Sequence, residues 1–491
     1  EFSRRRDRVN LAGIEVPFGA DLVFRASPPA SLCIGIEICE DLWATVPPSS
    51  YLSQAGANLI LNPSASNDLV GKSDYRLALV QQQSARCLAA YAYCSAGVGE
   101  STTDMVFGGD CMVAENGVVL ARAQRFERQA HLTTADIDIG YLQHERLANT
   151  TFGQGIAQAA PPPLPVVRDV SFQAADTTGE RCLRRCVQAH PFTPSDPQVR
   201  HERCQEVFAI QSTGLATRLH HTGLRDVVLG LSGGLDSTLA LLVCIEAFKR
   251  LGLDLAGLHA LTMPGFGTTD RTLSNVNKLC QHLGVALETI SIAASCQQHF
   301  ADIGHDGVSP DITFENVQAR ERTQILMDKA NLLQGLVIGT GDLSELALGW
   351  CTYNGDHMSM YAVNTGVPKT LVSFLIAYYA DDKADTATAE VLEDVLGTPI
   401  SPELLPPDPD GTIAQKTESV LGPYELHDFF LYHLIRRGSA PAKTLFLAQH
   451  AFAGMYERPV ILSCLKRFCH RFFTQQFKRS CLPDGPKVGT I

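Results

Sequence analysis

Residues 227–239, VVLGLSGGLDSTL, constrain the fold of this chain more than any other stretch. An apolar run ends at Leu231, small residues follow, and a helical pattern begins near Asp236. Glycines between a strand and a helix leave backbone N–H groups uncovered at the positive end of the helix dipole. Because such groups bind phosphate, the stretch predicts a strand–turn–helix unit with an anion site at the turn.

No lysine follows these glycines, which excludes the GxxxxGK[ST] phosphate loop. The pattern S-G-G-x-D-[ST] after a strand instead resembles the pyrophosphate-binding loop of the ATP pyrophosphatases. That resemblance implies cleavage of ATP to AMP and pyrophosphate, with a carboxylate at Asp236 that holds Mg²⁺. The loop positions assigned to ATP are Gly230, Leu231, Ser232, Gly233, Gly234, Leu235, Asp236 and Ser237. A glycine turn without a ligand is the alternative interpretation.

Strand and helix patterns alternate from residue 227 to about residue 340, and the strands are almost continuously apolar. This alternation predicts a doubly wound parallel sheet with helices on both faces, which binds its ligands at the carboxyl ends of the strands. Thr340, Asp342, Ser344 and Glu345 cluster at one such strand end. They are candidates for contact with Mg²⁺ and phosphate. The alternative is that Asp342 and Ser344 only cap a helix.

Composition limits the classes of partner. The 491 residues carry a formal net charge of -12, which argues against general binding to nucleic acids or anionic membranes. No apolar run approaches the roughly 18–20 residues that span a bilayer. The 15 cysteines show no paired C-x-x-C spacing, so we expect free thiols and a cytoplasmic location.

The first third of the chain predicts a second α/β region. Apolar strands are expected around residues 30–38, 55–63 and 92–100, with a hairpin at Asn116-Gly117 and a last strand at 135–140. Cys39 directly follows the first of these strands, where a nucleophilic thiol is often found. A small buried cysteine is the alternative.

The pieces ICEDLW, NPSAS, SARCLAAY and GESTTD resemble the second half of a nitrilase-type glutaminase domain of αββα architecture. The resemblance implies amide hydrolysis through a thioester at Cys39, with glutamine bound by Ser66 and Lys72. Lys72 departs from the arginine usual in relatives, and a lysine offers a point charge rather than a two-pronged contact. We therefore expect weaker binding of the glutamine carboxylate at this position.

The family's catalytic glutamate and lysine precede the cysteine, and the opening EFSRRR resembles the segment after that lysine. From this resemblance we expect a chain that lacks about half of the glutaminase domain, a length of roughly 130 residues against ordinary domain sizes. Without those two groups the thiol would lack a general base, so ammonia rather than glutamine is the expected nitrogen source. The predicted domains are a partial glutaminase at 1–153, a proline-rich linker at 154–198 that includes PPPLP (161–165), and a second domain at 199–491.

SGGLDST, FENVQAR, GTGDLSELALGW, YNGD and NTGVPKT, in that order, resemble the NAD synthetases of the glutamine-dependent kind. The family amidates deamido-NAD through an acyl-adenylate, with ATP and Mg²⁺, and it assembles into homo-oligomers. The resemblance assigns Thr340 and Lys369 to ATP, and Asp236 and Glu345 to the metal. It assigns these positions to deamido-NAD: Asn316, Glu345, Trp350, Cys351, Thr352, Tyr353, Asp356 and Lys478.

Two other hypotheses stay open from the sequence. One is a catalytically impaired chain with a structural or assembly role. The other is a different ATP-pyrophosphatase amide ligase that acts on another carboxylate.

Overall fold

The protein is described from a computed structural model that defines residues 7–27, 31–158, 167–173, 183–398, 401, 404–405 and 417–491. The segments 1–6 and 161–165, on which the expected truncation and part of the expected linker depend, lie outside these ranges. The chain divides into two compact units. The first comprises Glu1–Cys186 with Arg437–Ser439, and the second comprises Val187–Arg436 with Ala440–Ile491.

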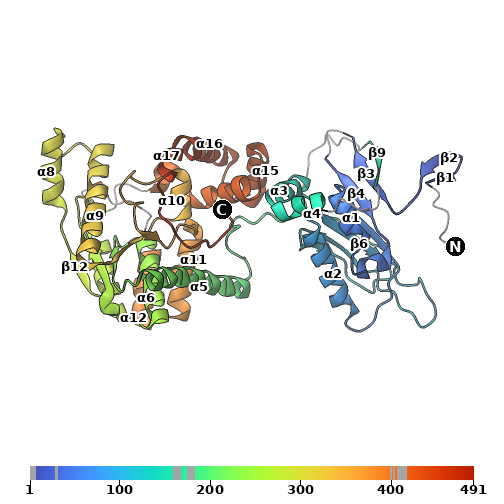
Figure 1. Ribbon diagram of the computed structural model, residues 1–491, viewed down its shortest axis with the longest axis horizontal. Helices are drawn as coiled ribbons and strands as arrows, with labels where there is room; N and C mark the ends of the chain where they lie inside the picture. The colour runs from blue at the N-terminus through green and yellow to red at the C-terminus, as the bar shows by residue number, and fades with distance from the viewer. Residues whose placement is uncertain are drawn as a thin grey trace. The chain divides into compact units, whose positions relative to one another are not determined.

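The first unit is built around a seven-stranded mixed sheet with the order β8-β7-β6-β5-β4-β3-β9 (Figure 1). The strands are β1 (Arg8–Leu11), β2 (Ile14–Pro17), β3 (Leu22–Ala26), β4 (Cys33–Ile36), β5 (Leu59–Ser64), β6 (Ala90–Ser95), β7 (Cys111–Glu115), β8 (Val118–Arg122) and β9 (Arg168–Phe172). The helices are η1 (Cys39–Trp43), α1 (Pro48–Gln54), α2 (Lys72–Arg86), α3 (Ile139–Ala148) and α4 (Thr150–Gln158). Strands β1 and β2 form a separate hairpin.

The central strands β4, β5 and β6 are parallel, so their carboxyl ends lie at one edge of the sheet. Alternating side chains of β5 and β6 face opposite sides. Ile60 and Tyr91 pack with α1 and α2, whereas Leu59 and Ala90 pack with α3. Helices on both faces therefore exclude water from this part of the sheet.

Two segments of the first unit differ from the sequence prediction. Residues 135–138 form no strand, because Asp138 caps α3 by accepting a hydrogen bond of 2.8 Å from the backbone N–H of Tyr141. Strand β9 pairs in parallel with β3, from Leu22↔Arg168 to Ala26↔Phe172. The described part of the expected linker 154–198 therefore contains an edge strand of the first unit's sheet.

The second unit contains a five-stranded, fully parallel sheet with the order β12-β11-β10-β13-β14. Its strands are β10 (Val227–Gly230), β11 (Leu258–Thr262), β12 (Leu287–Thr289), β13 (Leu336–Gly339) and β14 (Tyr361–Ala362). Its helices before and between these strands are α5 (Pro197–Thr222), α6 (Leu235–Leu251), η2 (Leu255–Gly257), α7 (Asp270–Leu283), α8 (Ala293–Ile303), α9 (Ile312–Leu333) and α10 (Leu343–Leu348).

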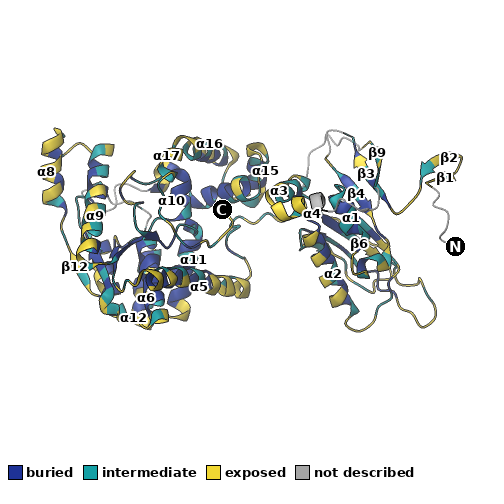
Figure 2. Cartoon of the chain, viewed as in Figure 1, coloured by how far each residue is buried: buried dark blue, intermediate teal, exposed yellow. Residues whose placement is uncertain are grey.

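Helices cover both faces of this sheet. Val227 and Leu229 of β10 share a core with α5, α6, α7, α11 (Lys369–Asp382) and α12 (Thr386–Leu396), whereas Val228 shares another with α8 and α9. Figure 2 shows buried residues on the sheet and exposed ones along the outer side of α5. The predicted parallel sheet with two covered faces is confirmed.

The remaining helices form an all-helical layer after the sheet. They are α13 (Thr417–Leu421), α14 (Tyr424–Phe430), the π-helix η3 (Leu431–Arg436), α15 (Pro441–Ala451), α16 (Arg458–Thr474) and α17 (Gln476–Arg479). Helix α14 packs against α11 and α16. None of the helices in the described ranges combines the length and apolarity that crossing a bilayer requires.

Acid is expected to destabilise this layer through His427. Burial lowers the pKa of His427 to about 4, and Arg467 and Arg471 act in the same direction. An unfolded histidine takes up its proton near pH 6.5. Between these two values the unfolded state binds more protons, so stability falls as the pH drops from about 6.5 to about 4, by roughly 3 kcal/mol at most.

Thermal unfolding at pH 7 and pH 5 measures this effect. His427→Gln keeps a donor for the carbonyl of Leu421, which His427 Nε2 contacts at 3.0 Å, and it does not titrate. Its Tm should fall less on acidification than that of the wild type, whereas the exposed His220→Gln control should behave like the wild type. Equal acid-induced losses in all three proteins would contradict the assignment.

Candidate active site

Three carboxylates of the second unit meet beside the point where the strand order reverses. Asp236 lies in the first turn of α6, directly after β10, whereas Asp342 and Glu345 begin α10, directly after β13. Strands β10 and β13 are parallel neighbours, and chain order runs away from β10 in both directions. Loops that leave such a pair diverge and open a crevice at the carboxyl ends.

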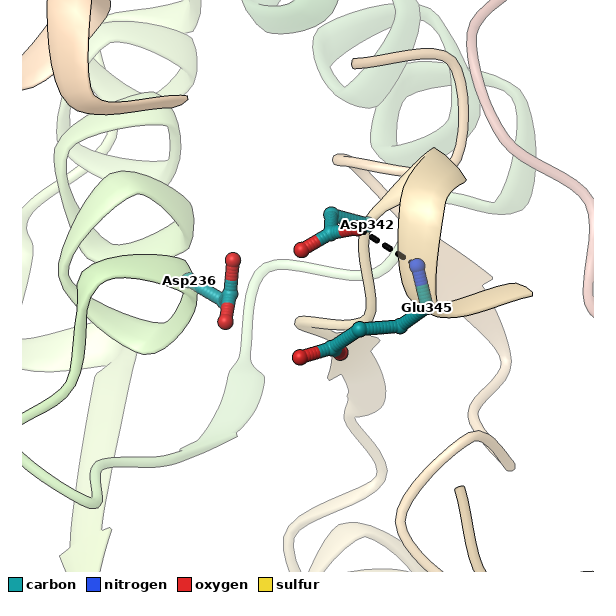
Figure 3. Close-up of side chains that lie close together, drawn as sticks. All are labelled: Asp236, Asp342 and Glu345. Carbon is teal, nitrogen blue, oxygen red and sulfur yellow. Dashed lines mark hydrogen bonds between the residues drawn. The ribbon is translucent and has the colours of Figure 1, made fainter. Parts of the chain in front are cut away.

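Oxygen atoms from Asp236, Asp342 and Glu345 lie within 4.8 Å of one another (Figure 3). Asp342 also caps α10, because its Oδ1 accepts a hydrogen bond of 2.9 Å from the backbone N–H of Glu345. One carboxylate oxygen of Asp342, Oδ1, thus caps the helix, and the other, Oδ2, faces the charged cluster. The two interpretations of Asp342 from the sequence, helix cap and member of an acidic cluster, both hold.

The ammonium group of Lys369, the first residue of α11, lies among these carboxylates. Its Nζ is 2.5 Å from Asp236 Oδ2, 2.7 Å from Asp342 Oδ2 and 2.8 Å from Glu345 Oε1. The residue is 2% exposed. Burial alone lowers the pKa of Lys369, but the three carboxylates raise it well above its usual value, so the lysine is charged.

The same burial acts on the carboxylates. It raises the pKa of Asp236 to about 7, and the nearby charge of Asp342 adds to this, while Lys369 opposes it. Burial also raises the pKa of Glu345 well above its usual value. Full ionisation of the three carboxylates beside one ammonium would give a formal charge of −2, so a bound cation would favour the ionised forms of Asp236 and Glu345.

The glycine turn before α6 is fixed by its own hydroxyl groups. Ser237 Oγ accepts a hydrogen bond of 3.3 Å from the backbone N–H of Ser232, and Ser232 Oγ accepts one of 3.3 Å from that of Gly234. Gly233 has φ +87°, and a Cβ there would lie 2.8 Å from the carbonyl oxygen of Thr272. This position therefore requires glycine.

A cavity of about 630 Å³ connects the turn, the carboxylates and the loop after α10. It brings together nearly all the residues that the sequence analysis assigned to ATP, metal and deamido-NAD. They are Gly230, Leu231, Ser232, Gly234, Leu235, Asp236, Ser237, Asn316, Thr340, Glu345, Trp350, Cys351, Thr352, Tyr353, Asp356, Lys369 and Lys478. Gly233 is the assigned position that does not line the cavity; it packs against Thr272 instead.

Polar contacts hold the loop between Trp350 and Asp356. Thr352 Oγ1 donates to Asn316 Oδ1 at 2.8 Å, and the Thr352 N–H donates to Asp356 Oδ1 at 2.6 Å. Lys478 Nζ donates to the carbonyl oxygens of Gly349 at 3.0 Å and Cys351 at 2.5 Å. Burial raises the pKa of Asp356 and lowers that of Lys478. The Lys478 ammonium therefore stabilises this loop through hydrogen bonds to its backbone carbonyl groups, and the residue also lines the cavity.

Sequence reasoning did not single out Asn364, which is fully buried beside the cluster. Its Nδ2 donates to the carbonyl oxygens of Asp236 at 2.9 Å and Thr340 at 3.1 Å, and so joins the two segments that follow β10 and β13. The Nε2 atom of Gln211, in α5, donates a hydrogen bond of 3.1 Å to Asn364 Oδ1. The segment NTGVPKT contained Asn364 as part of a motif, but no local pattern indicated this bridge.

In the first unit, Cys39 lies after β4 with a left-handed backbone, φ +49°. This conformation is strained in a non-glycine residue, and such strain is often found at reactive positions. Asn62 of β5 supports it: its Oδ1 accepts the Cys39 N–H at 3.0 Å, and its Nδ2 donates to Tyr91 Oη at 2.9 Å. Tyr91 in turn donates to the buried carboxylate of Glu37.

Ser66 follows β5, the parallel neighbour of β4, so it leaves the same edge of the sheet as Cys39. Its Oγ accepts a hydrogen bond of 3.3 Å from the fully buried Arg76, which also pairs with Asp110 at 2.8 Å. Lys72 is the first residue of α2, and its Nζ donates to Asn67 Oδ1 at 3.0 Å. Ser66 is thus held by an arginine that the sequence analysis had not considered.

Comparison with known families agrees with this arrangement. The NAD synthase family matches residues 208–455, and the carbon-nitrogen hydrolase family matches residues 6–146. A glutamine-dependent NAD(+) synthetase from Mycobacterium leprae is 42% identical, with 98% of this chain and 74% of that protein covered. The enzyme of that name from Mycobacterium tuberculosis H37Rv is 41% identical, with the same coverage of 98% and 74%.

A crystal structure of a glutamine-dependent NAD(+) synthetase from Cytophaga hutchinsonii matches with a TM-score of 0.47 and 19% identity, covering 98% of this chain and 72% of that one. The predicted fold class, a nitrilase-like α/β unit followed by a parallel-sheet synthetase unit, is confirmed by the two family matches. With 42% identity across 98% of its length, the chain belongs to the glutamine-dependent NAD(+) synthetase family.

Proposed function

We propose that the ATP-dependent amidation that makes NAD in this family takes place in the cavity of the second unit. The observation that carries the proposal is the meeting of three carboxylates and a buried lysine beside the glycine turn. This charge pattern suits the transfer of an adenylyl group, in which catalysis depends on positioning and charge neutralisation. No protein nucleophile is required.

The reaction has two steps at this site. The nicotinate carboxylate of deamido-NAD attacks the α-phosphate of ATP, and pyrophosphate leaves with the electrons of the broken P–O bond. Ammonia then attacks the acyl-adenylate carbonyl, loses a proton, and expels AMP to give NAD. The turn from Ser232 to Ser237 is the proposed cradle for pyrophosphate, because its backbone N–H groups start α6.

The residues of the cluster fit a Mg²⁺ ion. Asp236 Oδ1 is a buried oxygen without a hydrogen-bond partner among the described residues, and oxygen ligands with net negative charge are those that Mg²⁺ prefers. Asp236 and Glu345 would hold the ion. When bound, it would neutralise charge on the phosphates of ATP. Lys369 adds a fixed positive charge beside the carboxylate oxygens of Asp236 and Glu345 and thereby holds these two side chains close together.

The nicotinate end of deamido-NAD is assigned to the loop from Trp350 to Asp356. Asn316, Thr352 and Lys478 hold this loop, and their side chains line the same cavity as Asp236. Its shape is therefore set by buried hydrogen bonds. In the first unit, Cys39 is the proposed nucleophile for glutamine, with Ser66 and Lys72 as substrate contacts. Homo-oligomer formation stays a prediction from the family resemblance, and a cytoplasmic location stays a prediction from the cysteine pattern.

A product assay on the full chain tests the function. With ATP, Mg²⁺, deamido-NAD and ammonium, NAD, AMP and pyrophosphate should form in equal amounts. Ammonium as the nitrogen donor makes the assay independent of Cys39. Omission of deamido-NAD should abolish AMP formation. Pyrophosphate formed only with a different carboxylate would overturn the substrate assignment, and no product with any carboxylate would favour a structural role.

Asn316→Ala is expected to raise the KM for deamido-NAD about tenfold while the KM for ATP changes less than about twofold. The reason is that Asn316 lines the cavity and its Oδ1 accepts, at 2.8 Å, the hydroxyl of Thr352 in the loop assigned to deamido-NAD. Steady-state kinetics with ammonium measures both constants. Gln324→Ala, at an exposed position of the same helix α9, is the control. Equal increases for the two substrates would place Asn316 elsewhere.

A further inference from the structure

A fourth carboxylate, that of the buried Asp428 in α14, lies beside the site without belonging to the cluster. Asp428 is 1% exposed. Its Oδ1 accepts the hydroxyl of Ser344, and its Oδ2 accepts the backbone N–H of Thr370 at 2.9 Å and the Thr370 hydroxyl at 2.7 Å.

The partners of Asp428 adjoin the charged residues of the site. Ser344 precedes Glu345 in α10, and Thr370 follows Lys369 in α11. Ser344 Oγ also accepts the backbone N–H of Lys369 at 2.9 Å. One carboxylate therefore ties the starts of two helices together, and these helix starts, with the cap residue Asp342 included, carry three of the four charged groups in the cluster.

These contacts also complete the start of α11. That helix follows Pro368 and has no side-chain cap, so the N–H groups of its first turn need other acceptors. Asp428 and Ser344 supply acceptors for Thr370 and Lys369. An anion at this end is also favoured by the helix dipole. The orientation of α11, and with it the Lys369 side chain, thus depends on the layer that contains Asp428.

A second residue on the same face of α14 touches Lys369 directly. Tyr424 lies one turn before Asp428, and its ring centre is 5.3 Å from Lys369 Nζ. Residues four apart on a helix share a face. Burial raises the pKa of Asp428 to about 6, against the hydrogen bonds from Ser344 and Thr370, which lower it. A neutral side chain would avoid this cost, yet it would lack the capacity to accept all three donors.

We propose that Asp428 is a positioning residue for the ligation reaction: it holds the first turns of α10 and α11 so that Glu345 and Lys369 face Asp236. It touches no substrate and acts only through Ser344 and Thr370. This inference rests on the proposed roles of Glu345 and Lys369 in the site.

Asp428→Asn tests the proposal in the full chain. The asparagine amide has the same shape as the carboxylate, but its NH₂ group can only donate hydrogen bonds. It would replace the acceptor of either Ser344 or Thr370, so the start of α10 or of α11 loses that hydrogen bond. We expect kcat for ammonium-dependent NAD formation to fall about ten- to a hundredfold, with the KM for deamido-NAD changed less than about threefold. The Mg²⁺ concentration that gives half-maximal rate should rise, because Glu345 is displaced.

Glu425→Gln is the matched control, since Glu425 is a carboxylate on the same helix, its Oε1 accepts the Tyr456 hydroxyl at 2.5 Å, and it is not among the described residues that line the cavity. It should lower Tm without changing kcat. Thr370→Val removes only the hydroxyl contact to Asp428 and should give a smaller fall in kcat at nearly unchanged Tm. It serves as the second test if Asp428→Asn does not fold.

The outcomes separate the two levels of inference. A lower Tm with kcat within about twofold of the wild type, for Asp428→Asn or for Thr370→Val, would make Asp428 merely structural and overturn the proposal. If Asp236→Asn is inactive in the same assay, the proposed function survives such a result. If Asp236→Asn keeps full activity, the proposed site itself is wrong, whatever Asp428→Asn does.

Discussion

Replacing Asp236 with asparagine is expected to lower the rate of NAD formation by about a hundred- to a thousandfold while the chain stays folded. Asparagine has the shape of aspartate but no charge, so its amide oxygen is a weaker ligand for a cation shared with Glu345. Because burial raises the pKa of Asp236 to about 7, the substitution also removes a charge that is costly to bury. Asp342 and Glu345 still neutralise Lys369. The Tm is therefore expected to stay constant or to rise.

The measurement is ammonium-dependent NAD formation over a range of Mg²⁺ concentrations, together with thermal unfolding. Glu246→Gln is the control, because Glu246 is also on α6 and pairs with Lys249 at 3.1 Å and Lys383 at 3.0 Å, outside the cavity. It should keep the wild-type rate. If Asp236→Asn retained more than about a tenth of the rate at any Mg²⁺ concentration, the metal assignment would be wrong.

Lys369→Met is expected to abolish ligation and to lower the free energy of unfolding by about 3–5 kcal/mol. The substitution leaves the buried Asp342 and the partly exposed Asp236 and Glu345 without their shared ammonium group, which now lies 2.5–2.8 Å from each. Repulsion between them then favours protonation or local opening of the α10 and α11 starts. Loss of stability and loss of activity have the same electrostatic origin in this variant.

Chemical denaturation and the ammonium assay measure the two effects. Lys383→Met, at the other end of α11, removes a half-exposed ion pair with Glu246 and should cost at most about 1 kcal/mol without loss of activity. The double variant Lys369→Met/Asp236→Asn should recover part of the lost stability, because it also removes one of the repelling charges. Strict additivity of the two stability changes would refute the proposed charge coupling.

The chemistry of the site could be predicted where it depends on neighbours in the sequence. The proposed anion site at the turn from Ser232 to Ser237 depends on consecutive backbone N–H groups at a helix start, so a short motif is enough to indicate it. Likewise, Asp342 and Glu345 are three residues apart and share one helix start. Apolar strands that alternate with helices were sufficient to predict the parallel sheet.

Predictions failed where two conformations have similar local patterns. The alternation of apolar residues at 135–140 predicted a strand, but Asp138 instead caps α3, since a capping carboxylate and a strand-flanking one look alike in sequence. Residues 168–172 lie between proline-rich and polar stretches and were assigned to a linker. They form β9, because β3 offers an open edge with matching register. Both outcomes depend on partners elsewhere in the chain.

The sequence by itself determined which chemical groups this protein has available: a glycine turn with Asp236, a carboxylate pair at the start of a helix, and a cysteine after a strand. Only the tertiary structure decided that Lys369 lies among three carboxylates, 133 residues after Asp236, and that Asp428 joins the two helix starts. The physical reason is range. Motifs record contacts within a turn or two of backbone, whereas the order of strands brings distant residues to one crevice and burial then sets their charges.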